Sequence, residues 1–388
     1  MKIILKRTTV SNAIAPLMCA VSGKSTLTAA EGILINASFP DVCTFTTFDL
    51  FKGLKTTISA TVLEEGCYII NAQKFSQILR VMGGDEITLT IDSKMVATVT
   101  SGKSSHKMIA LNGSDFPETP DLVSDRSFIV GQGVLKKLLS QVSYAMANND
   151  QQRHILNGAF LKIEDDNITA VACDSFKIAK CRRRTGLTNK NTNGNEHLDY
   201  KFIVPTKTVN ELIRLLDDDP EAVTQLYVTR KHIVCIIGDI TFFSMLVDGE
   251  YLDYNRLISA NHVIKAKVDR VELLGALERA ALITEEKVER SVRAHVKVEL
   301  WGDLLKITAI SPIGSTYDEL AVGHEGNDIT IAFNNRFLMD TVRSCTADEI
   351  VLEITSPLNG MNIVPTDNDY EETGVEEVFM LLPVRTKD

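Results

Sequence analysis

The sequence predicts an α+β fold built from a repeated unit. A short β-branched run, an amphipathic helix and further strands follow one another six times along the 388 residues. A recurrence of roughly sixty to seventy residues is typical of proteins assembled from equivalent supersecondary units. The six repeats begin near Lys2, Tyr68, Phe128, Lys201, Val263 and Ile329.

Each repeat is expected to contain one helix with a buried apolar stripe, because apolar residues recur at the i, i+4, i+7 spacing. The first three stripes are Val10, Ile14, Leu17, Met18 and Val21; Phe75, Ile78, Leu79 and Met82; and Val134, Leu135, Leu138, Leu139 and Val142. The last three are Val209, Leu212, Ile213 and Leu216; Leu273, Leu274, Leu277, Ala280 and Ala281; and a weaker one of Phe337, Leu338, Thr341 and Val342.

Strands are predicted before and after each helix. Residues 202–204 form a short apolar run before a helix, and residues 86–91 alternate in polarity after one. In the second, fourth and sixth repeats an acidic turn follows the helix, at 83–86, 217–220 and 346–349.

The repeats therefore group in pairs, which predicts three domains of two β-α-β-β-β half-units each. Boundaries are expected in the Pro- and Asp-containing stretch 117–125 and in the polar stretch 259–262. The predicted domains are 1–125, 126–260 and 261–388.

The composition is that of a soluble protein, with 44% hydrophobic and 24% charged residues. No apolar run approaches the roughly 18 residues of a membrane span, and the first residues are too short a run for a signal sequence, so a cytoplasmic protein is expected. The cysteines are scattered, odd in number and never spaced C-x-x-C, which predicts reduced, structural thiols. They are Cys19, Cys43, Cys67, Cys173, Cys181, Cys235 and Cys345.

Catalytic and metal-binding motifs are weak. The histidines include no H-x-x-x-H pair, and there is no G-x-S-x-G sequence. Residues 23–25 and 102–104 both read Gly-Lys-Ser and imitate the end of a phosphate-binding loop. The glycine that this loop requires five residues earlier is Met18 in one copy and Ala97 in the other, so both copies are predicted to be turns.

The net charge of −10 argues against a protein that simply coats nucleic acid. Basic residues nevertheless gather on the predicted helices and at their ends, whereas acidic residues gather in turns. Either these are ordinary solvated helix faces, or the helices share a positive lining within an acidic body. The basic residues are Lys24, Lys74, Arg80, Lys136, Lys137, Lys207, Arg214, Arg279 and Arg343.

Eight short motifs, in order along the chain, resemble the bacterial replicative sliding clamp, the β subunit of DNA polymerase III. The first four are Asp115-Phe116-Pro117, Asn157-Gly158-Ala159-Phe160, the run from Ala172 to Ala179, and Phe202-Ile203-Val204-Pro205. The others are the run from Val247 to Tyr254, Glu278-Arg279-Ala280-Ala281, Phe333-Asn334, and Leu382-Pro383-Val384-Arg385.

The resemblance implies three clamp domains in a homodimeric ring around duplex DNA, with helices lining the inside and sheets outside. Twelve helices at about 8 to 10 Å spacing would leave a bore of about 20 to 28 Å, which admits a duplex. The implied function is that of a DNA polymerase processivity factor. It has no catalytic activity and no cofactor, and it tethers the polymerase α subunit, the clamp loader and repair proteins through a peptide pocket.

Three sets of site residues follow from the resemblance. The pocket would comprise Leu156, Cys173, Ser175, Phe176, Lys177, Ile178, Leu252, Arg256, Leu257, Val288, Asn334, Phe337, Leu382, Pro383, Val384 and Arg385. DNA would be met by Lys24, Asn149 and Arg153, and the dimer contact would join His106 and Met108 to Leu282 and Ile283 of the partner chain. Relatives often carry histidine, proline and phenylalanine where this chain has Phe176, Leu252 and Val288.

Residues 182–199 begin with three arginines and continue with a polar stretch, so an unusually long loop without an assigned role is expected there. Three alternatives stay open. They are an enzyme acting on a phosphorylated small molecule, suggested by the Gly-Lys-Ser turns, a repeat scaffold without a DNA role, and a specialised clamp paralogue.

Overall fold

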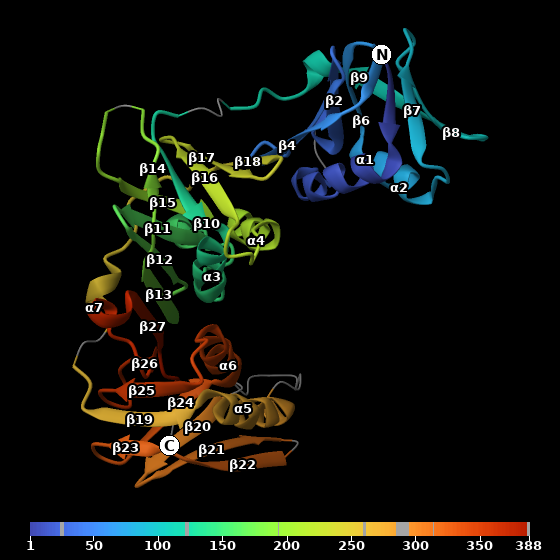
Figure 1. Cartoon of the computed structure of the whole chain (residues 1–388). Coiled ribbons are helices and arrows are strands. Elements are labelled where there is room, and N and C mark those ends of the chain that lie inside the picture. Colours follow the sequence, from blue (N-terminus) through green and yellow to red (C-terminus); the bar gives the residue numbers. More distant parts are fainter. Residues whose placement is uncertain are drawn as a thin grey trace. The chain divides into compact units, whose positions relative to one another are not determined.

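The computed structural model describes residues 1–23, 27–120, 124–192, 194–258, 261–284, 295–312 and 314–385. The chain forms two compact units (Figure 1). The first comprises 1–132, 188–196 and 214–246, and the second comprises 133–187, 197–213 and 247–388.

The six predicted β-α-β-β-β repeats are confirmed, and each begins within two residues of its expected residue. The first two are β1 (Lys2–Lys6), α1 (Arg7–Ile14), β2 (Gly32–Ser38), β3 (Val42–Phe48) and β4 (Lys52–Ser59), then β6 (Gly66–Asn71), α2 (Ala72–Val81), β7 (Glu86–Ile91), β8 (Val96–Ser101) and β9 (Ser104–Asn112). The middle two are β10 (Ser127–Gly131), α3 (Gln132–Ser143), β11 (Gly158–Glu164), β12 (Asn167–Cys173) and β13 (Lys177–Arg184), then β15 (Asp199–Pro205), α4 (Thr206–Leu215), β16 (Val223–Val228), β17 (His232–Ile237) and β18 (Ile240–Met245). The last two are β19 (Ile264–Asp269), α5 (Arg270–Thr284), β20 (His295–Trp301), β21 (Leu304–Ser311) and β22 (Gly314–Ala321), then β24 (Ile329–Asn334), α6 (Asn335–Ser344), β25 (Glu349–Ile354), β26 (Met361–Pro365) and β27 (Val375–Leu381), with the short α7 (Tyr370–Thr373) before β27.

The first helix is shorter than its apolar stripe predicts. The α-helix ends at Ile14, and a 3₁₀ turn from Pro16 to Ala20 carries the rest of the stripe, including the buried Leu17. Proline has no N–H to continue the helical hydrogen bonds, so the chain tightens there into the 3₁₀ form.

The odd repeats carry an additional short strand that the sequence did not indicate. These strands are β5 (Thr61–Glu64), β14 (Thr188–Asn189) and β23 (Gly323–Glu325). Each pairs antiparallel with the first strand of its own repeat: β5 with β1, β14 with β10 and β23 with β19. Each also forms an end of a sheet.

The first unit is built on one sheet in the order β14-β10-β16-β17-β18-β4-β3-β2-β6-β9-β8-β7-β1-β5. Helices α1 and α2 pack together against its strands (Figure 1). The side chain of Asn71 starts α2 by accepting the backbone N–H of Lys74 at 2.9 Å. The predicted stripe residues Phe75 and Leu79 are fully buried in the core of this unit.

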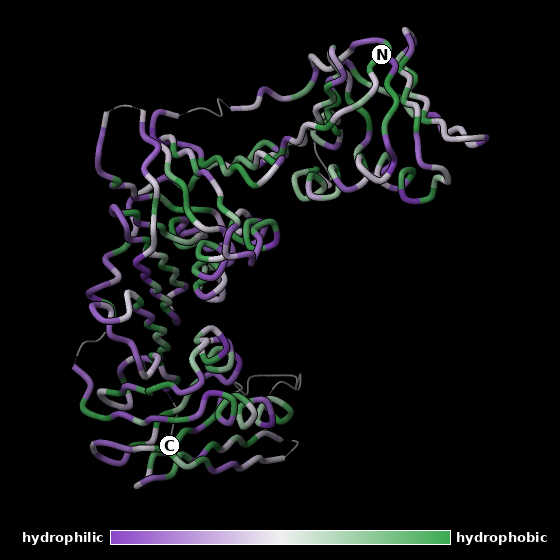
Figure 2. The backbone as a smooth tube through the Cα atoms, in the orientation of Figure 1, coloured by the Kyte–Doolittle hydropathy of each residue, from purple (hydrophilic) through white to green (hydrophobic). Residues whose placement is uncertain are grey.

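The second unit contains a nine-stranded sheet in the order β15-β11-β12-β13-β27-β26-β25-β19-β23 and a four-stranded sheet in the order β22-β21-β20-β24. Helices α5 and α6 pack on each other, and Leu277, Phe333 and Phe379 are fully buried. Hydrophobic residues concentrate along the strands and helices, whereas the α7 segment is largely hydrophilic (Figure 2).

The prediction of a loop over residues 182–199 is wrong for its first three residues. Strand β13 continues through Arg182, Arg183 and Arg184, and Arg182 and Arg183 lie opposite Glu376 and Val375 in β27. Glu377 of β27 pairs with Arg183, Glu371 of α7 pairs with Arg184, and Arg182 lies over the Tyr370 ring, so the basic run can stay in the sheet.

Among the described residues, no helix is both long and apolar enough to cross a membrane.

Candidate peptide-binding groove

The floor of the candidate groove is an apolar cluster in the second unit, and it joins four of the predicted residues. Leu156, Cys173 and Ile178 are buried in it, and Leu252 packs against it. Burial raises the pKa of the Cys173 thiol, so this cysteine behaves as a neutral, apolar side chain. The other buried members are Ala147, Phe160, Val171, Ile203, Tyr251 and Met380.

Three aromatic rings at the floor were missed as site residues. Phe160 stacks on Tyr251 with ring centroids 5.1 Å apart and an interplanar angle of 10°, and Tyr254 lies 6.1 Å from Phe160. All three rings lie in motifs that carry the resemblance, but nothing in the local pattern distinguishes them from ordinary core. Burial also raises the pKa of Tyr251, which therefore stays protonated.

The turn between β12 and β13 projects Phe176 outward. Asp174 Oδ1 accepts the backbone N–H groups of Phe176 at 3.0 Å and Lys177 at 2.9 Å, and Ser175 adopts a positive φ of 82°. The Phe176 side chain is 56% exposed and lies 6.0 Å from the Phe337 ring. An exposed ring paired with the half-buried ring of Phe337, next to an apolar floor, can hold an apolar side chain of a ligand.

Lys177 is buried beneath this aromatic pair. Its Nζ lies 3.1 Å from Asp174 Oδ2 and 4.4 Å from the centroid of the Phe337 ring. The ammonium is thus paired with both a carboxylate and a ring face, which makes its burial tolerable. Lys177 therefore supports the turn, and its charge is already satisfied within the chain.

The C-terminal segment is fixed at both sides of the groove. The Leu382 N–H donates to the Phe176 carbonyl at 2.9 Å, and the Val384 N–H donates to the Ala332 carbonyl in β24 at 2.8 Å. The half-buried Pro383 lies between these two bonds. Asn334 Oδ1 accepts the Phe337 N–H at 3.1 Å, so Asn334 caps α6.

The remaining predicted groove residues are peripheral. Arg256 is strongly exposed, and its Nε is 2.9 Å from Asp253 Oδ2. Leu257 and Arg385 are exposed, while Ile258, the neighbour of Leu257, packs against the floor. Val288 lies outside the described residues.

Two of the three predicted DNA contacts are described. Asn149 is exposed and has a positive φ of 65°. Arg153 Nη2 lies 2.9 Å from Asp150 Oδ2 and 2.6 Å from Ser175 Oγ. Lys24 lies outside the described residues.

The predicted dimer residues lie beside open backbone edges. Strand β9 pairs with β8 along 104–109 but with β6 only at 110–112, so the His106 and Met108 stretch is paired on one side. Leu282 in α5 is 76% exposed, and Ile283 packs near Gly314 at the start of β22. Within the described chain β22 pairs only with β21, and this second open edge was not predicted.

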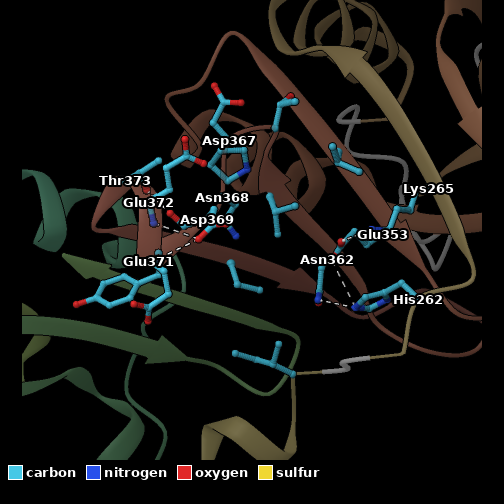
Figure 3. A pocket seen from close by; sticks show the side chains of 17 residues that line it. His262, Lys265, Glu353, Asn362, Asp367, Asn368, Asp369, Glu371, Glu372 and Thr373 are labelled. Atoms are coloured by element: carbon cyan, nitrogen blue, oxygen red, sulfur yellow. Dashed lines mark hydrogen bonds and ion pairs between the residues drawn. The ribbon is translucent and has the colours of Figure 1, made fainter. Parts of the chain in front are cut away.

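A separate polar pocket lies in the second unit (Figure 3). His262 Nε2 is 2.9 Å from Asn362 Nδ2 and 3.5 Å from Glu353 Oε2, and acidic residues of the α7 segment line another side. Within the described ranges, no group of three His, Cys, Asp or Glu residues is arranged to hold a metal ion.

Comparison with known proteins agrees with this repeated fold. Models of the N-terminal, central and C-terminal domains of the DNA polymerase III beta subunit match residues 1–120, 129–253 and 255–380. Three consecutive matches of this kind define a polymerase accessory subunit. The chain belongs to the DNA polymerase III beta subunit family, the beta sliding clamps.

Similar proteins cover essentially the whole chain. The beta sliding clamp of Chlamydia muridarum is 27% identical over 388 residues and 100% of both chains. That of Proteus mirabilis is 29% identical over 367 residues, covering 94% of this chain and 95% of the relative. The crystal structure of the DNA polymerase sliding clamp from Bacillus subtilis superposes with a TM-score of 0.90 at 25% identity, with 100% of both chains covered.

Proposed function

We propose that this protein is a DNA polymerase processivity factor that acts as a homodimeric ring around duplex DNA. The observation that carries this proposal is the succession of three beta-subunit domain matches over 1–120, 129–253 and 255–380. The gap between the first two matches supports a domain boundary near 125, whereas the second and third matches meet at residue 254, a few residues before the predicted boundary at 260. As family members act on DNA in the cell interior, we assign this protein to the cytoplasm.

Two copies are needed for a ring of sufficient bore. The described part of each chain contains six helices of at least eight residues, and twelve such helices at about 8 to 10 Å spacing leave about 20 to 28 Å, whereas six leave about 10 Å or less. The open edge of β9 and the open edge of β22 suit a head-to-tail contact, since backbone groups are available on both. Lys107 on β9 and Glu319 on β22 would then bring opposite charges to the contact, whereas Asp318 is already paired with Arg279 at 2.6 Å within the chain.

The ring has no catalytic role in this proposal. DNA is held by topology, while Lys24 and Arg153 meet phosphates without reading bases and Asn149 adds a polar contact. Such contacts are weak and independent of sequence, as sliding requires.

The groove is proposed to take a short extended peptide from the polymerase α subunit, the clamp loader or other partners. Its apolar floor and the Phe176–Phe337 pair suit a segment with glutamine followed by leucine and a terminal aromatic or aliphatic anchor. Arg256 and Asn334 offer polar contacts at the rim. Because ordering a flexible peptide opposes binding, a dissociation constant on the order of micromolar is expected.

A retention experiment tests the ring. The protein is first sized by light scattering, where a dimer has about twice the chain mass of 42.8 kDa. It is then loaded by its clamp loader onto nicked circular DNA, which is afterwards cut with a restriction enzyme. Retention on the circle and release on cutting are expected, whereas equal retention on cut DNA, or a monomer at micromolar concentration, contradicts the proposal.

A further inference from the structure

Two ion pairs link the neighbouring strands β13 and β27, and they join diagonally placed residues in opposite directions along the strands. Arg183 Nη2 lies 2.5 Å from Glu377 Oε1, and Lys180 Nζ lies 2.6 Å from Glu376 Oε1. In the register, Arg183 is opposite Val375 and Lys180 is opposite Val378, so each pair joins diagonal neighbours. Since side chains alternate across a strand, the two pairs lie on opposite faces of the sheet.

The Arg183–Glu377 pair is the more deeply buried of the two. Glu377 is 3% exposed, and the Arg183 side chain is 13% exposed. Arg183 Nη2 also donates to Gln141 Oε1 at 3.0 Å, and the Gln141 amide donates to the Ser344 carbonyl at the end of α6 at 3.4 Å. A buried pair of charges adds little net stability, but it penalises every arrangement that separates its members.

The alternation of apolar residues cannot by itself exclude a slip of two residues. A slip of one residue moves every side chain to the wrong face, whereas a slip of two keeps each on its own face. If β27 slipped so that Arg183 faced Glu377, Lys180 would face Met380, and Glu376 would lie four residues further along. The opposite slip would set Lys180 against Glu376 and separate Arg183 from Glu377 by the same amount. Each direction therefore breaks one of the two pairs.

The same register builds the groove. Ile178 is opposite Met380 on the floor, and Leu382, just beyond β27, donates to the Phe176 carbonyl. A slip of two residues would carry Leu382 about 7 Å from that carbonyl and replace Met380 beside Ile178. We propose that Lys180, Arg183, Glu376 and Glu377 are positioning residues that hold the two walls of the peptide groove in register. This inference rests on the proposed peptide-binding function.

Three variants of the buried pair test the inference. Glu377→Gln leaves Arg183 without a charged partner, Arg183→Met with Glu377→Leu replaces the pair by apolar side chains, and Arg183→Glu with Glu377→Arg reverses it. Glu349→Gln is the matched control, because it removes the carboxylate of a solvent-exposed cross-strand pair with Lys267 at 2.7 Å. Affinity for a fluorescent Gln-Leu peptide with a terminal phenylalanine and the unfolding temperature are measured for each protein.

The expected pattern separates positioning from stability. Glu377→Gln should weaken peptide binding by at least about tenfold, and the variant with the reversed pair should recover most of the lost affinity. The apolar pair should regain the unfolding temperature but not the affinity, because apolar side chains fill the site without opposing a slip. Wild-type affinity in the apolar variant, or in Glu377→Gln, overturns the inference.

A second readout does not depend on the peptide. Amide hydrogen exchange at Met380 and Leu381 should be faster in the apolar variant than in the wild type and in Glu349→Gln. If the wild-type protein binds no peptide, the proposed groove function fails, and the positioning inference is then judged by exchange alone. Unchanged protection of these amides in the apolar variant overturns it.

Discussion

The guanidinium of Arg153 donates a hydrogen bond to the Ser175 hydroxyl over 2.6 Å. One residue is proposed to meet DNA, and the other belongs to the turn that projects Phe176 into the groove. Asp150 competes for the same guanidinium, and hydrogen bonds from Arg153 and Gln152 hold the pKa of its carboxyl below the usual range. A phosphate that binds Arg153 would therefore act on a residue that is hydrogen-bonded to the turn of the proposed peptide site.

Charge reversal at the proposed DNA contacts should weaken retention. The double variant Lys24→Glu with Arg153→Glu should leave the closed circle several-fold faster than wild type, since two phosphate contacts become repulsive. The difference should shrink as salt rises, because screening weakens attraction and repulsion alike. Lys94→Glu, an exposed lysine in the turn before β8, is the control; equal retention in both variants would remove Lys24 and Arg153 from the DNA contact.

The aromatic pair of Phe176 and Phe337 should contribute much of the peptide affinity. Phe176→Ala is expected to weaken binding by roughly tenfold, because an aromatic anchor at the centre of an interface typically contributes over 1 kcal/mol. Calorimetric titration with the same peptide measures the effect. Phe51→Ala removes an equally large exposed ring elsewhere and should bind as wild type. An unchanged peptide dissociation constant for Phe176→Ala would show that the terminal anchor of the peptide binds elsewhere.

Removal of the C-terminal segment should separate peptide binding from assembly. A chain that ends before Leu382 loses the wall tied to Phe176 and Ala332, so peptide binding should be abolished. The dimer should persist, since the proposed dimer contact uses β9, β22 and α5. Anisotropy and light scattering measure the two properties, and truncation after Arg385 serves as control. Undiminished affinity in the longer truncation would mean that the site is placed wrongly.

A charge at the end of α5 should open the ring. Leu282→Glu places a carboxylate in a contact that is proposed to be apolar, and an unpaired charge there is costly to bury. Light scattering should report a monomer at concentrations where the wild type is dimeric. Val271→Glu changes another exposed apolar residue at the other end of the same helix and should remain a dimer. A dimeric Leu282→Glu protein would exclude this residue from the interface.

Thiol alkylation should be confined by burial. The reactive species is the thiolate, and burial raises the pKa of Cys43 and Cys235 to about 12 and that of Cys345 to about 11. At pH 8 these groups are almost wholly protonated as well as inaccessible, so iodoacetamide should label the exposed Cys67 first. Raising the pH to 9 should accelerate that reaction, because a larger fraction of the Cys67 thiol is ionised at the higher pH. Peptide mass mapping checks the order, and early labelling of Cys43 would contradict it.

Local pattern predicted the repeats but not their long-range pairing. Helix stripes such as Phe75 and Leu79 are visible because burial and helical period coincide within a few residues. The strand identity of Arg182 to Arg184 was not visible, since their partners Glu377, Glu371 and Tyr370 lie almost two hundred positions later. The short strands β5, β14 and β23 were missed for a related reason: each takes its conformation from the strand it meets, not from its own residues.

The groove was found through the resemblance, and periodicity alone would have assigned its floor to the core. Leu156, Cys173 and Ile178 are as buried as any core residue, so no local signal marks them as a site. Phe160 and Tyr251 were not predicted as site residues for the same reason. The exposed Phe176, on a turn with a positive φ before it, departs from what a core pattern predicts, as do the exposed Leu257 and Leu382.

The short end strands also bear on how newly made chains avoid sticking together. β5, β14 and β23 contain four, two and three residues, too few to template a sheet with a neighbouring molecule. The longer open edges, β22 and the first half of β9, carry side-chain charges of opposite sign. Two β22 edges would bring the exposed Glu319 of one copy near that of another, and two β9 edges would bring Lys107 near Lys107, whereas Asp318 is already paired with Arg279. In the proposed dimer contact, these charges favour the pairing of unlike edges over that of like edges, which reduces the aggregation of newly made chains.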